Sequence, residues 1–344
     1  MLRAFLHLLL FLAGFLLTAT WIHSLVPERQ KLEWLDTVKH DTDVIFLGSS
    51  HVYRQFDPQL FDLQRGAAAN GVRSINMGAL GMGLNEEAFL LNRILKQRSP
   101  KLRWIVIEAL PFDLQFQNEN DFGKRRLEWH DTESTWRLVR SLFQSELPRN
   151  EKWSLIRRHV EHWWRRSINL ARGLDVVEAV SAEPPSFDSN PGLGMNQDGY
   201  VPLQMATVTK RSRGMRQRFL QNPQALLAAA QALPKLKAEE QSVDEDLHSL
   251  VVGMEAQAAA AGVGIIWWLH PNLERYQGWR KMKADGDIHH LVAYDDPALY
   301  PAFYQVRWRF DLYHLNRKGA EMMTKIFAAD FLAIEQVAAG VGGQ

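Results

Sequence analysis

The chain has 344 residues, of which 46% are hydrophobic and 23% are charged, a composition that suits one large globular domain or a domain with a long insertion. Its formal net charge of +1 provides no general attraction to nucleic acid. The absence of cysteine excludes disulfides, thiolate catalysis and cysteine-ligated zinc.

An apolar run occupies the N-terminus, from Ala4 to about Val26. About 20 apolar residues are enough to cross a bilayer as a helix, so residues 1–27 are predicted to be a signal anchor, a single transmembrane helix in the inner membrane. Arg3 precedes the run and favours a cytoplasmic N-terminus. A cleaved signal peptide is the alternative. Both interpretations place the remainder of the chain in the periplasm.

Residues 28–114 have an α/β pattern. A short buried strand is predicted at 43–47 and a second near 74–77. A glycine-rich loop and a helix to about Gln97 follow, and then a third buried strand that ends near Glu108. Strand, helix and strand at this spacing form a βαβ unit, which predicts a parallel sheet.

Residues 115–222 lose this pattern and are predicted to be an insertion over the sheet. The segment contains basic runs such as WWRR and TKRSRGMRQR. Helical periodicity predicts one shared apolar face, with arginines opposite, made of Trp153, Ile156, Val160, Trp163, Trp164 and Ile168. This helix is interpreted either as a packed amphipathic element or as a surface for anionic lipid headgroups or an anionic polymer.

The α/β pattern returns over residues 223–335. A long helical stretch precedes the buried strand in VGIIWWLHP, which closes at His270, and a last helix begins near Asn316. Residues 336–344 are predicted to be a disordered tail.

Three segments carry the candidate chemistry. Ser50 follows the first strand, the glycine-rich loop follows the second, and Asp311 and His314 lie three residues apart before the last helix. A serine hydroxyl is a weak nucleophile unless a base accepts its proton, and that base needs a carboxylate to hold its tautomer. Loops at the carboxyl ends of parallel strands are where such groups can converge.

These motifs resemble the SGNH, or GDSL-type, hydrolase superfamily. FLGSSHVYRQFDP is similar to its first block, with Ser50 in the nucleophile position, and DLYHLNRKGA is similar to its fifth block, Asp-x-x-His-Leu-Asn-x-x-Gly. INMGALGMG resembles the second block, whose glycine amide helps to bind the oxyanion; Gly81 is the best match and Gly78 the next. The resemblance covers about residues 40–112 and 240–332.

The resemblance implies a three-layer α/β/α, flavodoxin-like fold and a triad of Ser50, Asp311 and His314. The backbone amides of Ser50 and Gly81 are expected to receive the oxyanion. No cofactor and no metal are expected.

Two departures from the family pattern matter. Ser49 stands where the family usually has Asp, and the third block, Gly-x-Asn-Asp, is absent because the third strand ends in IEALPFD. Asn76 and Asn85 flank the second block and are candidates to replace the missing oxyanion-binding Asn. In having Gly-Ser-Ser and no third block, the chain resembles a membrane-anchored branch of the superfamily. This branch includes alginate O-acetyltransferase-like proteins and the D-alanyl transfer protein of teichoic acids.

That branch moves acyl groups onto envelope polymers, commonly beside a multi-spanning membrane acyltransferase. The expected function is therefore serine-dependent acyl transfer or ester hydrolysis on a cell-envelope glycan, with a polysaccharide or acyl donor as substrate and no nucleic acid partner. The alternative is a non-catalytic SGNH-like module that binds polymer or scaffolds a membrane acyltransferase.

Each candidate residue also has a structural interpretation. Gly-Ser-Ser could be a turn whose hydroxyls cap the next segment, and Asp311 and His314 could be a helix cap and a surface histidine. Ser49 is expected to contribute through its backbone. Glu108 either lines the pocket or is a satisfied buried carboxylate. His51, which is expected to face away from the nucleophile, and His270 are more typical of loop residues than of ligands or bases.

Overall fold

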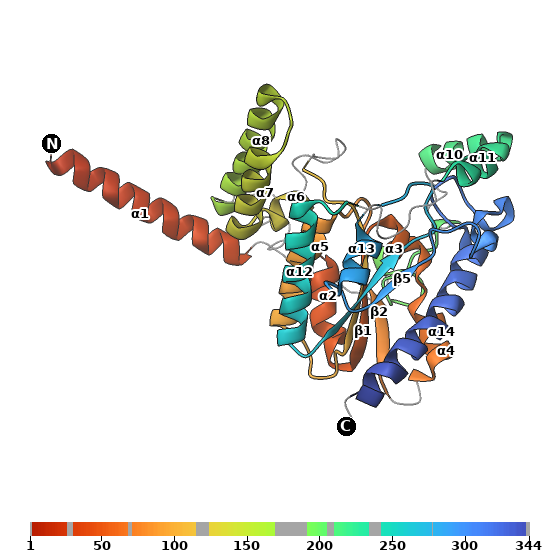
Figure 1. The fold of residues 1–344 in the computed structure, drawn as a ribbon. Helices are drawn as coiled ribbons and strands as arrows, with labels where there is room; N and C mark the ends of the chain where they lie inside the picture. The colour runs from red at the N-terminus through yellow and green to blue at the C-terminus, as the bar shows by residue number, and fades with distance from the viewer. Residues whose placement is uncertain are drawn as a thin grey trace. The chain divides into compact units, whose positions relative to one another are not determined.

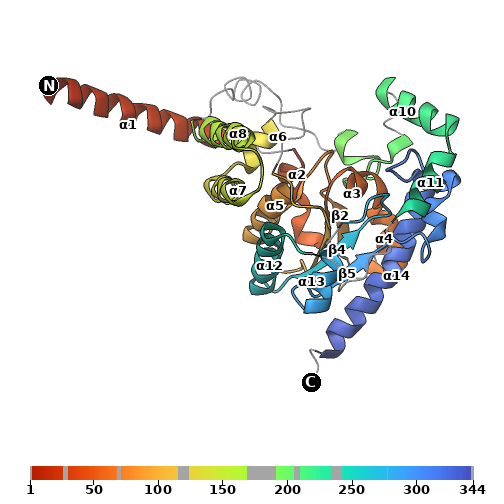
Figure 2. The same cartoon turned by 45° about the horizontal axis from the view of Figure 1, so that its top comes forward.

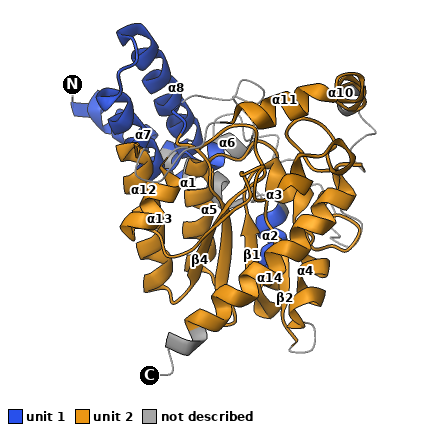
Figure 3. Cartoon of the chain, turned by 45° about the vertical axis from the view of Figure 1, so that its right-hand side comes forward, with its two compact units in different colours: residues 1–36, 113–186 blue, residues 37–112, 187–344 orange. Residues whose placement is uncertain are grey.

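The structure is a computed structural model that describes residues 2–25, 30–67, 71–114, 124–168, 191–204, 210–233, 242–276 and 278–341. Its contacts divide the chain into two units (Figure 3). Met1–Asp36 and Asp113–Ser186 form the first, here called the helical unit, and Thr37–Phe112 and Phe187–Gln344 form the second, here called the sheet unit. Residues 187–222 therefore group with the sheet unit, whereas the predicted insertion extends to residue 222.

The described strands form one five-stranded parallel sheet in the order β2-β1-β3-β4-β5 (Figure 1). Their bounds are β1 (Thr42–Leu47), β2 (Arg73–Asn76), β3 (Trp104–Glu108), β4 (Gly264–Leu269) and β5 (Leu291–Ala293). The α/β class and the parallel sheet are confirmed, and β5 is a strand that the sequence pattern did not indicate. In open sheets of this order, sites lie beyond the carboxyl ends of the strands where the order reverses, here between β1 and β3.

Helices cover both faces of this sheet, as a three-layer fold requires (Figures 1 and 2). α4 packs against α14 on one face, and α5 packs against α12 on the other. The helices of the sheet unit are η1 (Lys39–Asp41), α3 (Ser50–Gln55), α4 (Pro58–Arg65), α5 (Leu84–Lys96), η4 (Pro191–Leu193), α10 (Lys210–Gln221), α11 (Gln224–Ala232), α12 (Glu245–Ala260), α13 (Trp279–Asp285), η7 (Pro301–Tyr304), η8 (Val306–Trp308) and α14 (Arg317–Val341). Because α14 continues to Val341, the tail predicted as disordered is helical over its described part.

The core beneath α14 is built from aromatic side chains. Phe46 of β1 stacks on Phe56, with ring centroids 4.5 Å apart, and meets Phe61 of α4 edge to face at 5.1 Å. Phe327 and Phe331 of α14 complete the cluster. Rings packed in this way contribute about 0.5–1.5 kcal/mol per pair beyond the burial of their area, so they hold β1, and with it the segment that follows, in a fixed position.

The helical unit contains α1 (Leu2–Leu25), α6 (Lys124–Trp129), α7 (Thr132–Gln144) and α8 (Arg149–Ser167), and α2 (Gln30–Val38) crosses its boundary. Of the apolar face predicted on α8, Ile156 is buried, whereas Trp153 and Trp164 are each 52% exposed, so the face as a whole is not packed into a core. The buried side chains of α8 are Leu155, Ile156, His159 and His162. Histidine does not count as apolar in a periodicity argument, yet His159 is buried here with a hydrogen-bonding partner, His130, at 3.1 Å.

α1 has 24 residues, and its large apolar side chains, among them Leu2, Phe11 and Leu17, are exposed. Within the described ranges, no helix is found that has the length and apolar character needed to cross a membrane. The anchor over residues 1–27 therefore stays a prediction; residues 1, 26 and 27 lie outside the described residues.

Candidate active site

Ser50 is the first residue of α3, directly after the end of β1. The turn between the two elements requires a glycine: a Cβ at Gly48 would lie 2.3 Å from Cγ2 of Val52 and 2.8 Å from Cβ of Glu108. Ser49 is the N-cap of α3, and its hydroxyl accepts a hydrogen bond from the amide of His51 at 3.3 Å. The amide of Ser50 has no acceptor within the helix, because the first amides of any helix lack one.

Ser50, His314 and Asp311 form a continuous chain of polar contacts. Oγ of Ser50 lies 3.0 Å from Nε2 of His314, and Nδ1 of the same ring lies 3.0 and 3.1 Å from the two carboxylate oxygens of Asp311. Oδ1 of Asp311 also accepts the amides of Tyr313 and His314, each at 2.8 Å, which fixes the carboxylate in the turn. This arrangement lets His314 accept a proton from Ser50 while Asp311 holds the Nδ1–H tautomer.

The electrostatics of the pair suit a general base. Burial lowers the pKa of His314 below its ordinary value, and the hydrogen bond to Asp311 offsets only part of that effect. For Asp311 burial acts to raise the pKa, but the hydrogen bonds from His314 and from two backbone amides outweigh it, so the pKa is lowered. At neutral pH His314 is therefore a neutral acceptor beside an ionised carboxylate.

The two adjacent serines are not equivalent. Ser49 Oγ lies 3.0 Å from Nδ1 of His51, but this nitrogen is also the one that contacts Glu108 Oε1, at 2.7 Å. A triad needs a base that contacts the nucleophile through one ring nitrogen and the carboxylate through the other. Only Ser50 of the two has that arrangement, through His314.

Glu108 is fully buried and accepts hydrogen bonds from both neighbours of Ser50. Its Oε2 accepts the amide of Ser49 at 2.7 Å, and its Oε1 lies 2.7 Å from Nδ1 of His51. Of the two interpretations of Glu108, the satisfied buried carboxylate is confirmed, and its hydrogen bonds also fix the segment that carries Ser50.

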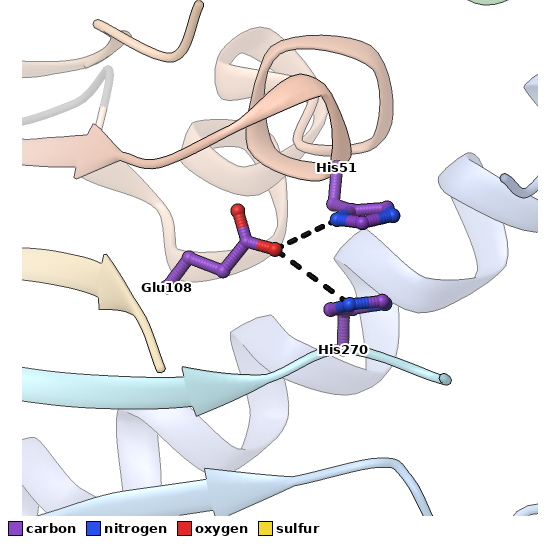
Figure 4. Close-up of side chains that lie close together, drawn as sticks. All are labelled: His51, Glu108 and His270. Carbon is purple, nitrogen blue, oxygen red and sulfur yellow. Dashed lines mark hydrogen bonds and ion pairs between the residues drawn. The ribbon is translucent and has the colours of Figure 1, made fainter. Parts of the chain in front are cut away.

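His51 and His270 stack on each other next to Glu108, with ring centroids 3.6 Å apart (Figure 4). The ring of His51 also stacks at 5.1 Å from that of His314, so it lies beside the triad and does not turn away from it as expected. Nε2 of His270 lies 3.7 Å from Oε1 of Glu108, and burial, together with His51, lowers the pKa of His270 well below its ordinary value. No sequence signal links these three residues, because 57 and 162 positions separate consecutive members.

Two of the expected oxyanion donors are committed elsewhere, and these expectations are wrong. Both amide hydrogens of Asn76 are used, because Nδ2 donates to the carbonyls of Val52 at 2.7 Å and Phe56 at 2.9 Å. Oδ1 of Asn76 accepts the amide of Gly78 at 2.9 Å, so this amide is occupied as well. Asn76 ties α3 to the second strand, which is a structural role that its proximity to the glycine-rich block did not reveal.

Gly81 and Asn85 stay predictions as oxyanion donors. Gly81 lies in an exposed turn with φ of +62°, a conformation that glycine adopts without strain. Asn85 is buried in the first turn of α5. Of the five groups expected at the oxyanion, the amides of Ser50 and Gly81 and the side chain of Asn85 remain.

Arg309 holds the loop that carries the base, and the sequence pattern did not single it out. It is fully buried and donates to the carbonyls of Phe303 at 2.6 Å, Leu312 at 3.1 Å and Pro271 at 2.8 Å. Burial lowers its pKa to about 10, so the guanidinium stays charged at neutral pH. These bonds tie the loop before α14 to the end of β4, which positions Asp311 and His314 against Ser50.

No protein-family model matches the chain, and no curated protein does.

Proposed function

We propose that this protein is an SGNH-type serine acyltransferase or esterase that acts on a cell-envelope glycan. The observation that carries the proposal is the unbroken contact chain from Ser50 through His314 to Asp311, at 3.0 Å for each step. The location of Ser50 also supports the proposal, because this residue follows β1 at the point where the strand order of the parallel sheet reverses.

In the proposed reaction Oγ of Ser50 attacks the carbonyl carbon of an acyl ester, and its proton moves to Nε2 of His314. Collapse of the tetrahedral intermediate breaks the bond to the leaving alcohol, which takes that proton and leaves an acyl-serine. Water, in an esterase, or a sugar hydroxyl, in a transferase, then loses its proton to His314 and attacks the acyl-serine. Collapse of the second intermediate breaks the bond between the acyl group and Oγ of Ser50, which takes the proton back from His314. Asp311 stays ionised and stabilises the imidazolium in both halves.

The oxyanion is proposed to bind to the amides of Ser50 and Gly81, with Asn85 as a further donor. One missing donor costs about 3–4 kcal/mol of transition-state stabilisation if nothing replaces it. Because Asn76 and Gly78 already have partners, the hole has few donors. This is the observation that favours the alternative function, a non-catalytic module that binds polymer or scaffolds a membrane acyltransferase.

The proposed substrate is an envelope polysaccharide or its acyl donor, and a multi-spanning membrane acyltransferase is the proposed partner. A basic segment close to Asp311 supports an anionic polymer: Arg216 of α10 donates to the carbonyls of Arg309 and Phe310, each at 2.7 Å. Arg213 and Arg218 on the same helix are exposed. The exposed apolar side chains of α1 support the proposal that the protein is anchored in the inner membrane and faces the periplasm.

The proposal predicts that a fluorophosphonate probe labels the protein at Ser50 and that Ser50→Ala abolishes labelling. Ser49→Ala is the matched control, because it removes a neighbouring hydroxyl but keeps the backbone amide that Glu108 accepts. This control loses a helix cap, worth about 1 kcal/mol, and the contact of the Ser49 hydroxyl with Nδ1 of His51. It should still be labelled, because Ser50, His314 and Asp311 are unchanged. If the folded natural chain is not labelled, the catalytic proposal fails and the non-catalytic module is favoured.

A further inference from the structure

We propose that His51, Glu108 and His270 form a binding site for one divalent transition-metal ion, with Zn²⁺ as the preferred ion, beside the serine triad. The three residues come from the ends of three adjacent strands: His51 after β1, Glu108 at the end of β3 and His270 after β4. Figure 4 shows that their polar atoms converge on Oε1 of Glu108. The proposal does not depend on the proposed acyl chemistry.

Unsatisfied nitrogens at the site are the first argument. His270 is 1% exposed, and among the described residues neither of its ring nitrogens has a hydrogen-bond partner. A buried polar group without a partner costs about 1–3 kcal/mol. Coordination of a metal ion through Nε2 of His270 would remove that cost for this nitrogen.

The distances are the second argument. A tetrahedral ion with bonds of 2.0–2.2 Å separates its ligand atoms by about 3.4 Å. Nε2 of His270 already lies 3.7 Å from Oε1 of Glu108, so the distance between these two ligand atoms needs little adjustment. Nδ1 of His51 lies 2.7 Å from the same oxygen, where a proton now bridges the two groups. The ion would replace this proton, which is released to solvent. The distance from Nδ1 of His51 to Oε1 of Glu108 would then increase by about 0.7 Å.

The surroundings are the third argument, because ligands in metal sites are held in place by further hydrogen bonds. The amide of Ser49 donates to the free carboxylate oxygen of Glu108 at 2.7 Å. The hydroxyl of Ser49 lies 3.0 Å from Nδ1 of His51, close enough to serve as the fourth ligand or to bind a water in that position. Two imidazoles and one carboxylate favour Zn²⁺ and its neighbours over Mg²⁺ and Ca²⁺, which prefer oxygen ligands alone.

The experiment uses the untagged full chain, freed of metal and titrated with Zn²⁺ and with Co²⁺ as a spectroscopic probe. We expect one equivalent to bind and the Co²⁺ form to show the visible absorption of a four- or five-coordinate ion. His270→Ala and Glu108→Gln should each weaken binding at least about tenfold. His289→Ala is the matched control: His289 also pairs with a glutamate, Glu255, at 3.1 Å, but it is exposed.

Ser50→Ala should bind the metal as the natural chain does, which separates this proposal from the proposed catalysis. X-ray absorption at the zinc edge of the natural chain should show two imidazole ligands, and it decides the matter even if the buried variants do not fold. The proposed metal site would be overturned by any one of three results: no stoichiometric binding, no imidazole scattering, or equal metal affinity in folded His270→Ala and in the natural chain.

Discussion

At the scale of single residues, the function of each candidate group depends on which atom of its neighbour it meets. Ser49 and Ser50 are adjacent and chemically identical, yet only Ser50 meets a ring nitrogen whose opposite nitrogen is held by a carboxylate. The same distinction applies to Asn76, whose two amide hydrogens are both occupied by backbone carbonyls. Donor and acceptor inventories of this kind decide between roles that residue type leaves open.

The lowered pKa of His314 predicts the pH dependence of labelling by the fluorophosphonate. The base acts in its neutral form, so the labelling rate falls as pH decreases through the pKa of His314. Since burial places this pKa below its ordinary value of 6.5, the midpoint of the fall should lie below pH 6.5. Asp311→Asn should lower the rate about 10⁴-fold at pH 7, as expected when the tautomer is lost. A midpoint above pH 6.5 in the natural chain would contradict the assignment.

At the scale of elements, the loop between η8 and α14 brings His314, the candidate base, to Ser50, the candidate nucleophile. Arg309 makes this possible, because its buried guanidinium donates to the carbonyls of Phe303 and Leu312 nearby in the chain and to that of Pro271 after β4. The nucleophile side is held equally tightly by Gly48, where a methyl group would collide with Val52 and Glu108. Both halves of the triad are therefore set by close packing of backbone segments.

Arg309→Met should destabilise the protein and also slow labelling at Ser50. The change leaves the carbonyls of Phe303, Leu312 and Pro271 without their donor, which we expect to cost about 2–4 kcal/mol in the free energy of unfolding. Urea denaturation measures this loss. Arg307→Met is the control, because Arg307 is exposed two residues away and should change stability by no more than about 0.5 kcal/mol. Equal losses in both variants would show that Arg309 does not hold the loop.

At the scale of the whole molecule, the N-terminal segment bears on the proposed location of the site. α1 exposes apolar side chains along its length, from Leu2 to Trp21. An exposed apolar helix of this kind is costly in water unless a membrane or a partner covers it. The proposed inner-membrane anchor would keep the sheet unit in the periplasm, next to its proposed glycan substrate.

The anchor predicts that the apolar run remains attached to the mature protein. Protein extracted from membranes with detergent should have the intact mass of the full chain, and high salt without detergent should not release it, because apolar burial is not screened by ions. A mature chain that begins between Ala19 and Pro27 would instead identify a cleaved signal peptide.

Local sequence was a good guide wherever a structural signal is carried by neighbouring residues. The buried strands that became β1, β3 and β4 are continuous apolar runs, as expected of a parallel sheet covered on both faces. Ser50 and the Asp311–His314 pair were found because each belongs to a short motif. β5 has only three residues, which is too short for any periodicity to be detected.

What the sequence by itself determined is therefore the α/β class, the order of the main elements and the residues of the candidate triad. Only the tertiary structure decided that the side chain of Asn76 donates to backbone carbonyls and accepts the amide of Gly78. The same holds for the anchoring by Arg309 of the loop that carries Asp311 and His314, and for the meeting of His51, Glu108 and His270. The physical reason is that these contacts join residues brought together only when the strands align. Periodicity records which side of an element is buried, but it contains no information about which atoms of distant segments face each other there.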